Sequence, residues 1–552
     1  MPRSRRPLRS VCWLLLLLAR PLDAATAARG IVAAEHELAV KAGVAMFERG
    51  GNAVDAAVAT VFATGVVNPS SCGIGGGGFA LIHDGKSRQD HVVDFRETAP
   101  HAATADMYLH DGKVVPGLSL RGGLAVAVPG EIKGLARVLR DFGTLSLATV
   151  LSPAIRYAQD GFPVGPHLAA ELAANAEEIR RRPALAAVYL KADGTSYAQG
   201  ETLVQRDLAS TLRAVAEGGP RAFYEGTIAE RLVRAAAAEG GIVDAADLRS
   251  YRERMRKPLR TEYRGLAVLG VPPPSSGGGV VLEILNVLDG YDLRSAGPKS
   301  AFGLHRIAQA ESVAFRDRAR YYGDPDFVEV PMARLLSAEH AEELRREIAA
   351  AGPAGNEALP ERGGTAHTSA LDAHGNAAAI TSTINTAFGS MVLAPGTGVV
   401  LNNEMDDFSA APGVPNVYGL VGNAANAIAA GKRPLSSMSP TLVLRDGAPL
   451  LAIGGSGGPR IITATVQTLV NVVDYGMDLD AAVSAPRIHE QGIPPPLFVE
   501  PALDAATVAG LRKLGHDVVE ARDLGAVGAV MRTDGGLVGV GDARKGGAAA
   551  GW

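Results

Sequence analysis

Apolar and polar residues follow two different patterns along this chain, one with helical and one with strand-like spacing. Residues 35–49 and 53–66 are Ala-rich stretches with helical spacing, divided by two glycines and by Asn52, a capping residue. The same spacing dominates residues 129–350, with Pro and Gly pairs as stops. Inside that region, residues 266–271 form a short apolar run that indicates a buried strand. The first part of the chain is therefore predicted to be mostly helical.

Residues 363–385 instead show strand spacing on both sides of a polar turn at 372–376. This turn predicts an antiparallel hairpin in which Thr365 lies opposite residue 384. A slip of one residue in the pairing would place Thr383 or Asn385 beside Thr365 instead. Further strands are predicted at 398–401, 441–444 and 450–453, and a helix at 461–473. The pattern alone supports a mixed α and β fold.

Length and composition narrow the class of protein. At 552 residues, the chain exceeds a single typical core and predicts one large unit or two closely joined ones. The apolar fraction of 47% argues against a disordered chain. With 54 Lys and Arg against 58 Asp and Glu, the net charge of -4 gives no reason to expect nucleic acid or an anionic membrane as a partner. Substrate recognition must therefore depend on local features.

The N-terminus has the composition of a secretory signal. Four arginines precede an apolar run at 11–19, and small residues follow at 23–28. A retained membrane anchor is disfavoured because the run is shorter than the ~20 residues of a spanning helix. We expect a signal peptide at 1–27, export to a periplasm or out of the cell, and no stable membrane anchor. Loss of Cys12 with the signal would leave Cys72 alone, without an internal disulfide or a Cys-based metal site.

Two other stretches have ordinary structural interpretations. The run 73–78 matches the spacing of a dinucleotide fingerprint, but a predicted helix precedes it and a strand follows it, the reverse of what that motif requires. We expect its glycines to let a turn and a strand pack closely. Residues 311–322 mix charges with apolar groups at helical spacing, which predicts a solvated helix face.

Thr365 is the candidate catalytic residue. An isolated strand threonine is usually only a β-former. Here, however, a Pro- and Gly-rich loop at 351–364 precedes it, and chains are often cut in such loops. Cleavage after Gly364 would give Thr365 a free α-amine with a pKa of about 7.7 to 8.0, which can accept the hydroxyl proton of the same residue. One residue would then supply both nucleophile and base.

Other polar positions leave alternatives open. Arg96 ends a short strand. It is either an ordinary surface arginine or a residue whose guanidinium binds a substrate carboxylate through two hydrogen bonds. The glycine turn 454–460 before a helix is either flexible or a site for an anion or oxyanion. The irregular stretch 411–432 is either a lid or disordered. Because the histidines lack the spacing of a zinc site, we expect no metal, and we expect no cofactor.

Six motifs, in this order, resemble the γ-glutamyltranspeptidase family. They are GIGGGGF (73–79), DFRETAP (94–100), TAH with STIN (365–367 and 382–385), LNNEMDDFS (401–409), RPLSSMSP (433–440) and GGSGGPR (454–460). The resemblance covers essentially the whole chain after the signal. It implies an α+β, four-layer αββα N-terminal-nucleophile hydrolase fold, one intertwined unit that self-cleavage divides into a large subunit (28–364) and a small catalytic subunit (365–552).

The resemblance also implies a catalytic role for each matching residue. Thr365 would be the nucleophile, and Gly364 and Thr365 would flank the bond that the precursor cuts. Thr383 would orient Thr365. Gly457 and Gly458 would form the oxyanion hole.

For the substrate, the resemblance implies two groups of residues that bind the free amino-acid end of a γ-glutamyl group. The residues implied to hold its α-carboxylate are Arg96, Ser436 and Ser437. Those implied to hold its α-ammonium are Asn385, Glu404 and Asp407. Tyr418, in the lid at 411–432, would shield the acyl-enzyme from water.

The implied activity is that of a γ-glutamyltransferase and glutathione hydrolase, with the two subunits as a heterodimer. Glutathione and other γ-glutamyl compounds would be donors, and water, amino acids or peptides the acceptors. One alternative is cephalosporin acylase activity on a glutaryl chain without the α-amine, which would leave Asp407 unpaired. The other is an unprocessed, non-enzymatic relative.

Overall fold

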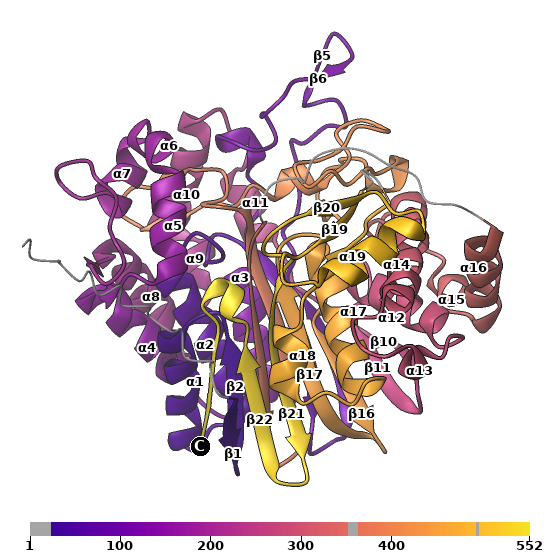
Figure 1. Cartoon of the computed structure of the whole chain (residues 1–552). Coiled ribbons are helices and arrows are strands. Elements are labelled where there is room, and N and C mark those ends of the chain that lie inside the picture. Colours follow the sequence, from indigo (N-terminus) through magenta and orange to yellow (C-terminus); the bar gives the residue numbers. More distant parts are fainter. Residues whose placement is uncertain (1–23, 351–362, 493–495) are drawn as a thin grey trace, which may run out of the picture.

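The computed structural model describes residues 24–350, 363–492 and 496–552, and its centre consists of two seven-stranded antiparallel sheets (Figure 1). The first sheet has the order β1 (Ala25–Ala27), β22 (Gly536–Gly541), β21 (Ala526–Thr533), β17 (Ala448–Ser456), β16 (Thr441–Arg445), β11 (Leu266–Gly270) and β10 (Leu259–Tyr263). The second has the order β23 (Ala548–Gly551), β2 (Gly30–Ala34), β12 (Gly363–Asp372), β13 (Ala377–Thr386), β3 (Gly77–Asp84), β4 (Gln89–Asp94) and β9 (Arg254–Arg256). Segments from both ends of the chain thus share each sheet.

Helices cover the outer face of each sheet (Figure 1). Those near the second sheet include α1 (Glu37–Glu48), α2 (Ala53–Val67), α3 (Glu131–Phe142), α4 (Leu147–Asp160) and α8 (Arg206–Gly218). Those near the first include α12 (Gly277–Leu288), α14 (Ala301–Tyr321) and α17 (Arg460–Val473). The remaining helices are α5 (Pro166–Ala174), α6 (Ala176–Arg180), α7 (Pro183–Tyr189), α9 (Arg221–Tyr224), α10 (Gly226–Ala238), α11 (Ala245–Ser250), α13 (Leu293–Ala296), α15 (Met332–Leu335), α16 (Ala338–Ala350), α18 (Leu479–Ser484) and α19 (Ala505–Lys513).

Short strands make the smaller sheets. They are β5 (Leu109–His110) with β6 (Lys113–Val114), β7 (Phe162–Pro163) with β8 (Thr202–Leu203), β14 (Leu393–Ala394) with β15 (Val399–Val400), and β18 (Ile488–His489) with β19 (Leu497–Val499) and β20 (Val518–Glu520).

The period of two along β13 shows how the layers pack. Ala378 and Ile380 point into the cluster shared with α1 and α2, whereas Ala377 and Ala379 point into the core between the two sheets. From the opposite side, Leu442 of β16 enters this inner core, and its neighbour Val443 packs under α12 and α14. Side chains that alternate in this way require helix, sheet, sheet and helix in four layers. The predicted αββα arrangement is confirmed.

The pattern of apolar residues located most elements to within a few positions. The helices predicted at 35–49 and 53–66 are α1 and α2, and Asn52 forms a capping box with Asp55 at the start of α2. The run at 266–271 is β11, in the first sheet. The predicted strand at 398–401 shortens to β15, Val399–Val400.

The prediction of a solvated face at 311–322 holds only in part. Arg316 and Arg320 are exposed. On the same helix, α14, Glu311, Asp317 and Arg318 are buried, with exposed fractions of 0%, 4% and 5%. Helices α12 and α16 pack against α14, and Gln467 of α17 donates to Glu311 at 3.2 Å. The spacing along α14 alone gives no sign of these contacts.

The β12–β13 hairpin has one irregularity, and it lies at Thr365. Asp372 stabilises the turn by accepting hydrogen bonds from the N–H groups of His374 (2.9 Å) and Asn376 (3.0 Å). A shift of register between Gly364 and Thr365 then pairs Thr365 with Thr383, and Gly364 with Asn385. The partner is therefore Thr383, one of the two predicted slips, and not residue 384.

The glycine run at 73–78 packs against this hairpin. A Cβ atom on Gly76 would lie 1.9 Å from the carbonyl oxygen of Thr383, so only glycine allows this approach. The run precedes β3 and supports β13 from behind, in agreement with a structural role. Cys72, next to it, is buried and carries a free thiol.

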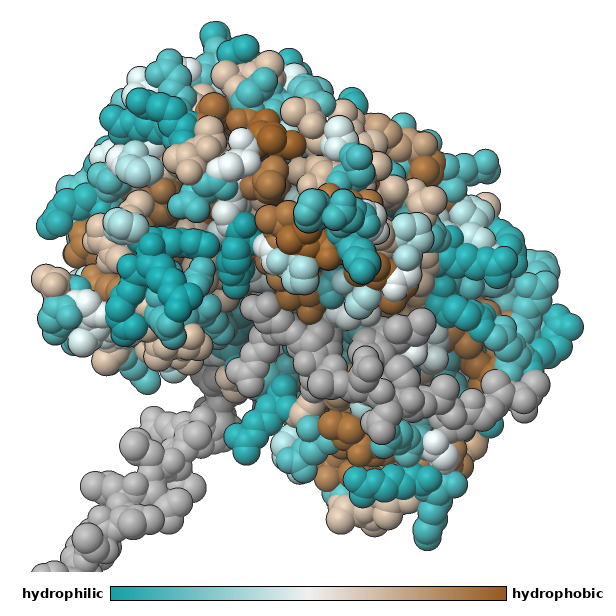
Figure 2. Space-filling view, turned by 90° about the horizontal axis from the view of Figure 1, so that it is seen from above, coloured by the Kyte–Doolittle hydropathy of each residue, from teal (hydrophilic) through white to brown (hydrophobic). Residues whose placement is uncertain are grey.

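Residues 1–23 of the predicted signal peptide, and 351–362 of the predicted cleavage loop, lie outside the described residues. Ala25–Ala27 form β1 and pair with β22, so a boundary at residue 27 would remove an edge strand of the first sheet. Within the described ranges, none of the helices has the length and apolar character needed to cross a membrane. Figure 2 shows a face that mixes hydrophilic and hydrophobic side chains.

Candidate functional site

One small cavity brings together most of the residues predicted to act in function. Its volume is about 20 Å³, and its lining is Arg96, Thr365, Thr383, Asn385, Glu404, Asp407, Tyr418, Ser436, Ser437, Met438, Gly458 and Ile461. These residues come from the hairpin, the end of β4, the stretch 404–438 and the turn before α17. A cavity of this size holds about one water molecule, so a larger ligand must displace side chains to enter.

The hydroxyl of Thr365 lies at the bulge of the hairpin and is only 3.1 Å from that of Thr383. The Thr383 hydroxyl donates to the carbonyl oxygen of Gly364 at 2.7 Å and accepts from the N–H of Asn385 at 2.8 Å. Since the single proton of Thr383 points to Gly364, Thr365 must be the donor in the contact between the two hydroxyls. Thr383 therefore contacts both Thr365, the predicted nucleophile, and the carbonyl group that Thr365 would attack.

The turn before α17 forms another wall of the cavity. Gly457 and Gly458 have φ angles of 123° and 62°, a region that favours glycine. Gly458 lines the Thr365 cavity, and a Cβ there would lie 2.9 Å from the ring of Tyr418. Gly457 lines an adjacent cavity of about 310 Å³. The two predicted oxyanion residues are thus adjacent in the chain but border different cavities.

Arg96 is the central charge of the site and is 1% exposed. Its guanidinium donates to Asp407 at 2.5 Å, forms an ion pair with Glu404 and lies 3.5 Å from Glu97. The surface interpretation of Arg96 is therefore wrong. The residues predicted to hold opposite ends of a substrate instead contact one another directly.

Carboxyl groups outnumber cations around Arg96. Three carboxyl groups face one guanidinium, and Oε1 of Glu97 and Oε1 of Glu404 have no hydrogen-bond partner among the described residues. Burial raises the pKa of Glu97 to about 8. Burial also raises the pKa of Glu404 and Asp407, against the attraction of Arg96. A cluster of this kind is suited to bind an added positive group.

Ser436 and Ser437 lie at the other side of this cluster. The Ser436 hydroxyl accepts from the N–H of Met438 at 3.1 Å, and the Ser437 hydroxyl lies 3.5 Å from Arg318 of α14. Arg318 also donates to Ser276 at 2.9 Å. Nothing in the spacing around Arg318 connects it with the site, because its neighbours predicted a solvated helix face.

Tyr418 closes the cavity from the stretch 411–432. Its hydroxyl contacts both the carbonyl oxygen (2.9 Å) and the side-chain oxygen (2.8 Å) of Asn385. Its side chain is 4% exposed. This stretch is ordered around Tyr418 and covers the site, which favours the lid over the disordered alternative.

Lys545 is a contact of Thr365 that the sequence did not reveal. Its ammonium donates to the carbonyl oxygen of Thr365, lies 3.3 Å from the Ser456 hydroxyl and forms an ion pair with Glu35 at 2.8 Å. Lys545 is 180 residues from Thr365 in a Gly- and Ala-rich segment without a recognisable motif. Only the pairing of the C-terminal strands could have indicated it.

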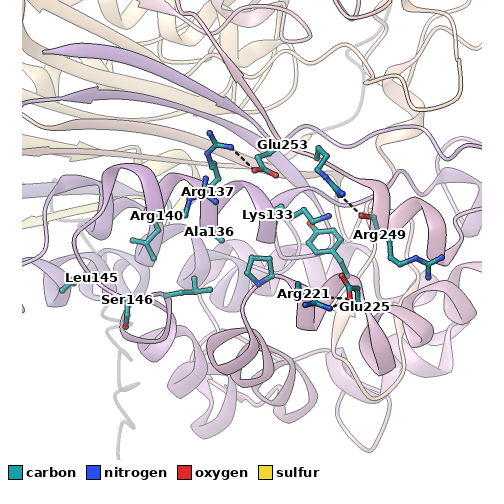
Figure 3. Close-up of a pocket in the computed structure, with 15 residues that line it drawn as sticks. Lys133, Ala136, Arg137, Arg140, Leu145, Ser146, Arg221, Glu225, Arg249 and Glu253 are labelled. Atoms are coloured by element: carbon teal, nitrogen blue, oxygen red, sulfur yellow. Dashed lines mark hydrogen bonds and ion pairs between the residues drawn. The ribbon is translucent and has the colours of Figure 1, made fainter. Parts of the chain in front are cut away.

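A larger cavity, of about 620 Å³, lies elsewhere and contains none of the predicted site residues (Figure 3). Its charged lining is Lys133, Arg137, Arg140, Arg221, Glu225, Arg249, Arg252 and Glu253. Several of these charges are paired, including Arg221 with Glu225 at 2.9 Å. The volume of a cavity therefore does not by itself identify the candidate functional site.

Comparison with known proteins finds a family and several relatives. The family model described as Gamma-glutamyltranspeptidase matches residues 39–552. The chain is 42% identical to the glutathione hydrolase proenzyme of Escherichia coli (strain K12) over 528 residues, which is 94% of this chain and 91% of that protein. It is 41% identical to the acylase ACY 1 proenzyme of Pseudomonas sp. (strain V22) over 531 residues, 93% of this chain and 92% of that protein. The crystal structure of cephalosporin acylase from Bacillus halodurans superposes with a TM-score of 0.85 at 29% identity, covering 100% of this chain and 99% of that one.

The four-layer fold is that of the N-terminal-nucleophile hydrolases. More particularly, the chain belongs to the γ-glutamyltranspeptidase family, as its motifs predicted. No metal site was expected from the spacing of the histidines, yet in the described parts of the chain Glu283, Asp317 and His340 lie close enough together to share an ion. This group is outside the Thr365 cavity.

Proposed function

We propose that this enzyme is a self-processing γ-glutamyltransferase and glutathione hydrolase with Thr365 as its nucleophile. Cleavage after Gly364 divides the chain into a large subunit (28–364) and a small catalytic subunit (365–552). The observation that carries the proposal is the contact of the Thr383 hydroxyl with both Thr365 and the Gly364 carbonyl.

Maturation begins with attack of the Thr365 hydroxyl oxygen on the carbonyl carbon of Gly364. The new C–O bond replaces the C–N bond, so the acyl group moves from nitrogen to oxygen and the proton moves to the released amine. Thr383 polarises the carbonyl through its 2.7 Å hydrogen bond. Water then hydrolyses the ester and leaves Gly364 as a carboxylate and Thr365 with a free amine.

Catalysis repeats the same attack on a donor. The free amine of Thr365, with a pKa of about 7.7 to 8.0, accepts the hydroxyl proton. The oxygen attacks the γ-carbonyl carbon, the amine of the donor leaves with a proton, and a γ-glutamyl ester remains on Thr365. N–H groups of Gly457 and Gly458 stabilise the negative oxygen. Water, an amino acid or a peptide amine then removes the γ-glutamyl group.

Recognition of the donor is an exchange of partners around Arg96. The α-carboxylate of the donor replaces a protein carboxylate on the guanidinium and also contacts Ser436 and Ser437. The released acids, Asp407 and Glu404, turn to the α-ammonium together with Asn385. Because the site has more carboxyl groups than cations, it can release a proton and balance the ammonium group of a bound donor.

Substitution of Thr365 tests the nucleophile. We expect Thr365→Ala to remain uncut and to release 4-nitroaniline from γ-glutamyl-4-nitroanilide at least about 10,000-fold more slowly than wild type. Thr365→Ser keeps the hydroxyl and is the matched control, with cleavage and measurable turnover. Release by Thr365→Ala at the wild-type rate would exclude the mechanism.

Acylase activity on glutaryl chains is the second candidate, because an acylase proenzyme and a cephalosporin acylase structure resemble this chain closely. A glutaryl donor lacks the ammonium and would leave Asp407 and Glu404 without a counter-charge. We therefore expect the wild type to prefer γ-glutamyl over glutaryl donors, and Asp407→Asn to reduce that preference by about 100-fold. Equal turnover of both donors by the wild type would favour the acylase.

We also infer export, with removal of the N-terminal segment, from the signal-like composition of residues 1–27. Fractionation of the native host should find the activity outside the cytoplasm. Mass spectrometry of the large subunit will show whether β1 stays with the mature enzyme. Activity that stays in the cytoplasm, on a large subunit that begins at Met1, would contradict export.

A further inference from the structure

Three side chains from three separate helices meet beneath the first sheet. Glu283 comes from α12, Asp317 from α14 and His340 from α16. Nε2 of His340 lies 2.6 Å from Oδ2 of Asp317 and 3.6 Å from Oε1 of Glu283, and one ligand atom from each residue lies within 4.8 Å of the others. All three are buried, with exposed fractions of 1%, 4% and 5%.

His340 has polar partners on both ring nitrogens, Asp317 at 2.6 Å and Glu343 at 3.4 Å, but other atoms of the cluster lack hydrogen bonds. Neither oxygen of Glu283 has a hydrogen-bond partner among the described residues, and neither does the buried hydroxyl of Tyr322. That hydroxyl lies over Gly279, one turn before Glu283 on α12. A buried carboxylate without partners carries a large desolvation cost, so such groups in native proteins usually have an unseen partner.

One proton does not balance the charge of this cluster. An imidazolium between two carboxylates leaves one negative charge buried, and neutrality needs a second proton on Glu283. Even then, the 3.6 Å between Glu283 Oε1 and His340 Nε2 is longer than a hydrogen bond. A divalent cation, in contrast, is balanced by two carboxylates and a neutral imidazole, and it can contact both acids and the ring at once.

We propose that Glu283, Asp317 and His340 form a site for a divalent transition-metal ion, with Zn²⁺ as the best match. Imidazole and carboxylate ligands suit Zn²⁺, which binds them at about 2.0–2.2 Å. Ligand atoms around one such ion lie about 3.4 Å apart. Loss of the Nε2 proton would open the 2.6 Å contact to that spacing, while the 3.6 Å contact already fits. Tyr322 or water can complete the coordination.

The position of the site indicates a structural role. None of its residues lines the Thr365 cavity, but Asp317 precedes Arg318, which contacts Ser276 and Ser437. α16 is the last described element before Gly363. A metal ion would therefore tie the end of the large subunit to α12 and α14, and it would do so whether or not the proposed function is correct.

Metal analysis of the purified enzyme tests the site without using activity. After dialysis against EDTA, ZnCl₂, MnCl₂ or MgCl₂ is added separately, free ions are removed by gel filtration, and bound metal and Tm are measured. We expect about one Zn²⁺ per chain with a raised Tm, and no retained Mg²⁺. Tight Mn²⁺ in place of Zn²⁺ would support the site and correct the metal.

Variants locate the ion. Glu283→Gln keeps the size of the side chain and should weaken Zn²⁺ binding by at least about 100-fold and abolish the Tm shift, because it removes a direct ligand. His340→Asn should do the same. Glu342→Gln, an exposed acid on the same helix, is the matched control and should bind as wild type does. If wild type retains fewer than about 0.1 Zn²⁺ or Mn²⁺ per chain, or Glu283→Gln binds as tightly as wild type, the proposal is overturned.

Discussion

Two buried ionic clusters in this enzyme differ in the ratio of carboxyl groups to arginines. Around Arg96, three carboxyl groups face one guanidinium, and two of their oxygens lack partners among the described residues. In the second cluster, Arg487 and Arg544 face Asp542 and Glu500, with contacts of 2.6–3.1 Å. Each of the four carboxylate oxygens there accepts at least one hydrogen bond. The Arg487 cluster is complete within the protein, whereas the Arg96 cluster is not.

The pKa shifts show the same contrast. Burial alone would raise the pKa of Asp542, but attraction to Arg487 and Arg544 lowers it. At Glu97 the attraction of Arg96 does not outweigh burial, and the pKa rises to about 8. Balanced clusters stabilise a fold, and unbalanced ones are typical of sites that bind a charged ligand. The comparison therefore supports the proposed role of Arg96 in substrate binding and indicates a structural role for Arg487.

The largest expected effect is on activity at the Arg96 cluster. Arg96→Lys keeps one positive charge but loses the fork that a carboxylate requires. We expect kcat/KM for a γ-glutamyl donor to fall at least about 1,000-fold, or ~4 kcal/mol, while the enzyme remains folded. Steady-state kinetics, with circular dichroism as the control, measures this. An unchanged kcat/KM would remove Arg96 from substrate binding.

The balanced cluster should show its effect in stability instead. Asp542→Asn leaves Arg487 buried without its counter-charge and should lower the free energy of unfolding by about 3–5 kcal/mol. At a temperature where the variant is folded, kcat/KM should stay within about threefold of wild type. Denaturant unfolding of this variant is compared with Asp534→Asn, at an exposed turn, which should change stability by less than about 0.5 kcal/mol. If Asp542→Asn loses activity without losing stability, the structural role given to the Arg487 cluster is contradicted.

The smallest expected effect, per pH unit, concerns how the free energy of unfolding changes with pH. Glu97 and Asp542 should contribute to this change with opposite signs. Glu97 holds a proton in the folded state up to a pKa of about 8, against 4.5 when unfolded, so its contribution to stability falls as pH rises through that window. Asp542 has a lowered pKa, so its contribution is present above about pH 3.8 and is lost on acidification.

Substitution separates the two contributions. Glu97→Gln should remove a fall of up to ~1.4 kcal/mol per pH unit between about pH 5 and 8. Asp542→Asn should reduce only the loss of unfolding free energy that wild type shows at acid pH. Unfolding free energies of each variant and wild type from about pH 2 to about pH 8 give the slopes. Identical profiles for the two variants would contradict the assignment.

Local patterns predicted the elements well because the information for them is local. The turn at 372–376 and the alternation after it were enough to identify β12 and β13. The bulge that pairs Thr365 with Thr383 depends on a one-residue shift that no local pattern specifies. The four-layer arrangement followed from the motifs of the family, since apolar spacing does not say which sheet a strand joins.

Contacts between distant segments account for what was missed. The face of α14 at Glu311 and Asp317 has ordinary helical spacing, and only the packing of other helices buries it. Lys545 reaches Thr365 because β23 pairs with β2 at the edge of the second sheet. Arg96 was identified, but its direct ion pairs with Asp407 and Glu404 were not, because residues more than 300 positions apart make them.

The central claim is that the chain gains its nucleophile by cutting itself before Thr365. The most direct measurement is a denaturing gel of the purified protein, with N-terminal sequencing of the smaller band. We predict two bands, the smaller one beginning with Thr365, and a single uncut band for Thr365→Ala. An active enzyme that runs as one intact band, or a small subunit that begins at another residue, would contradict the claim.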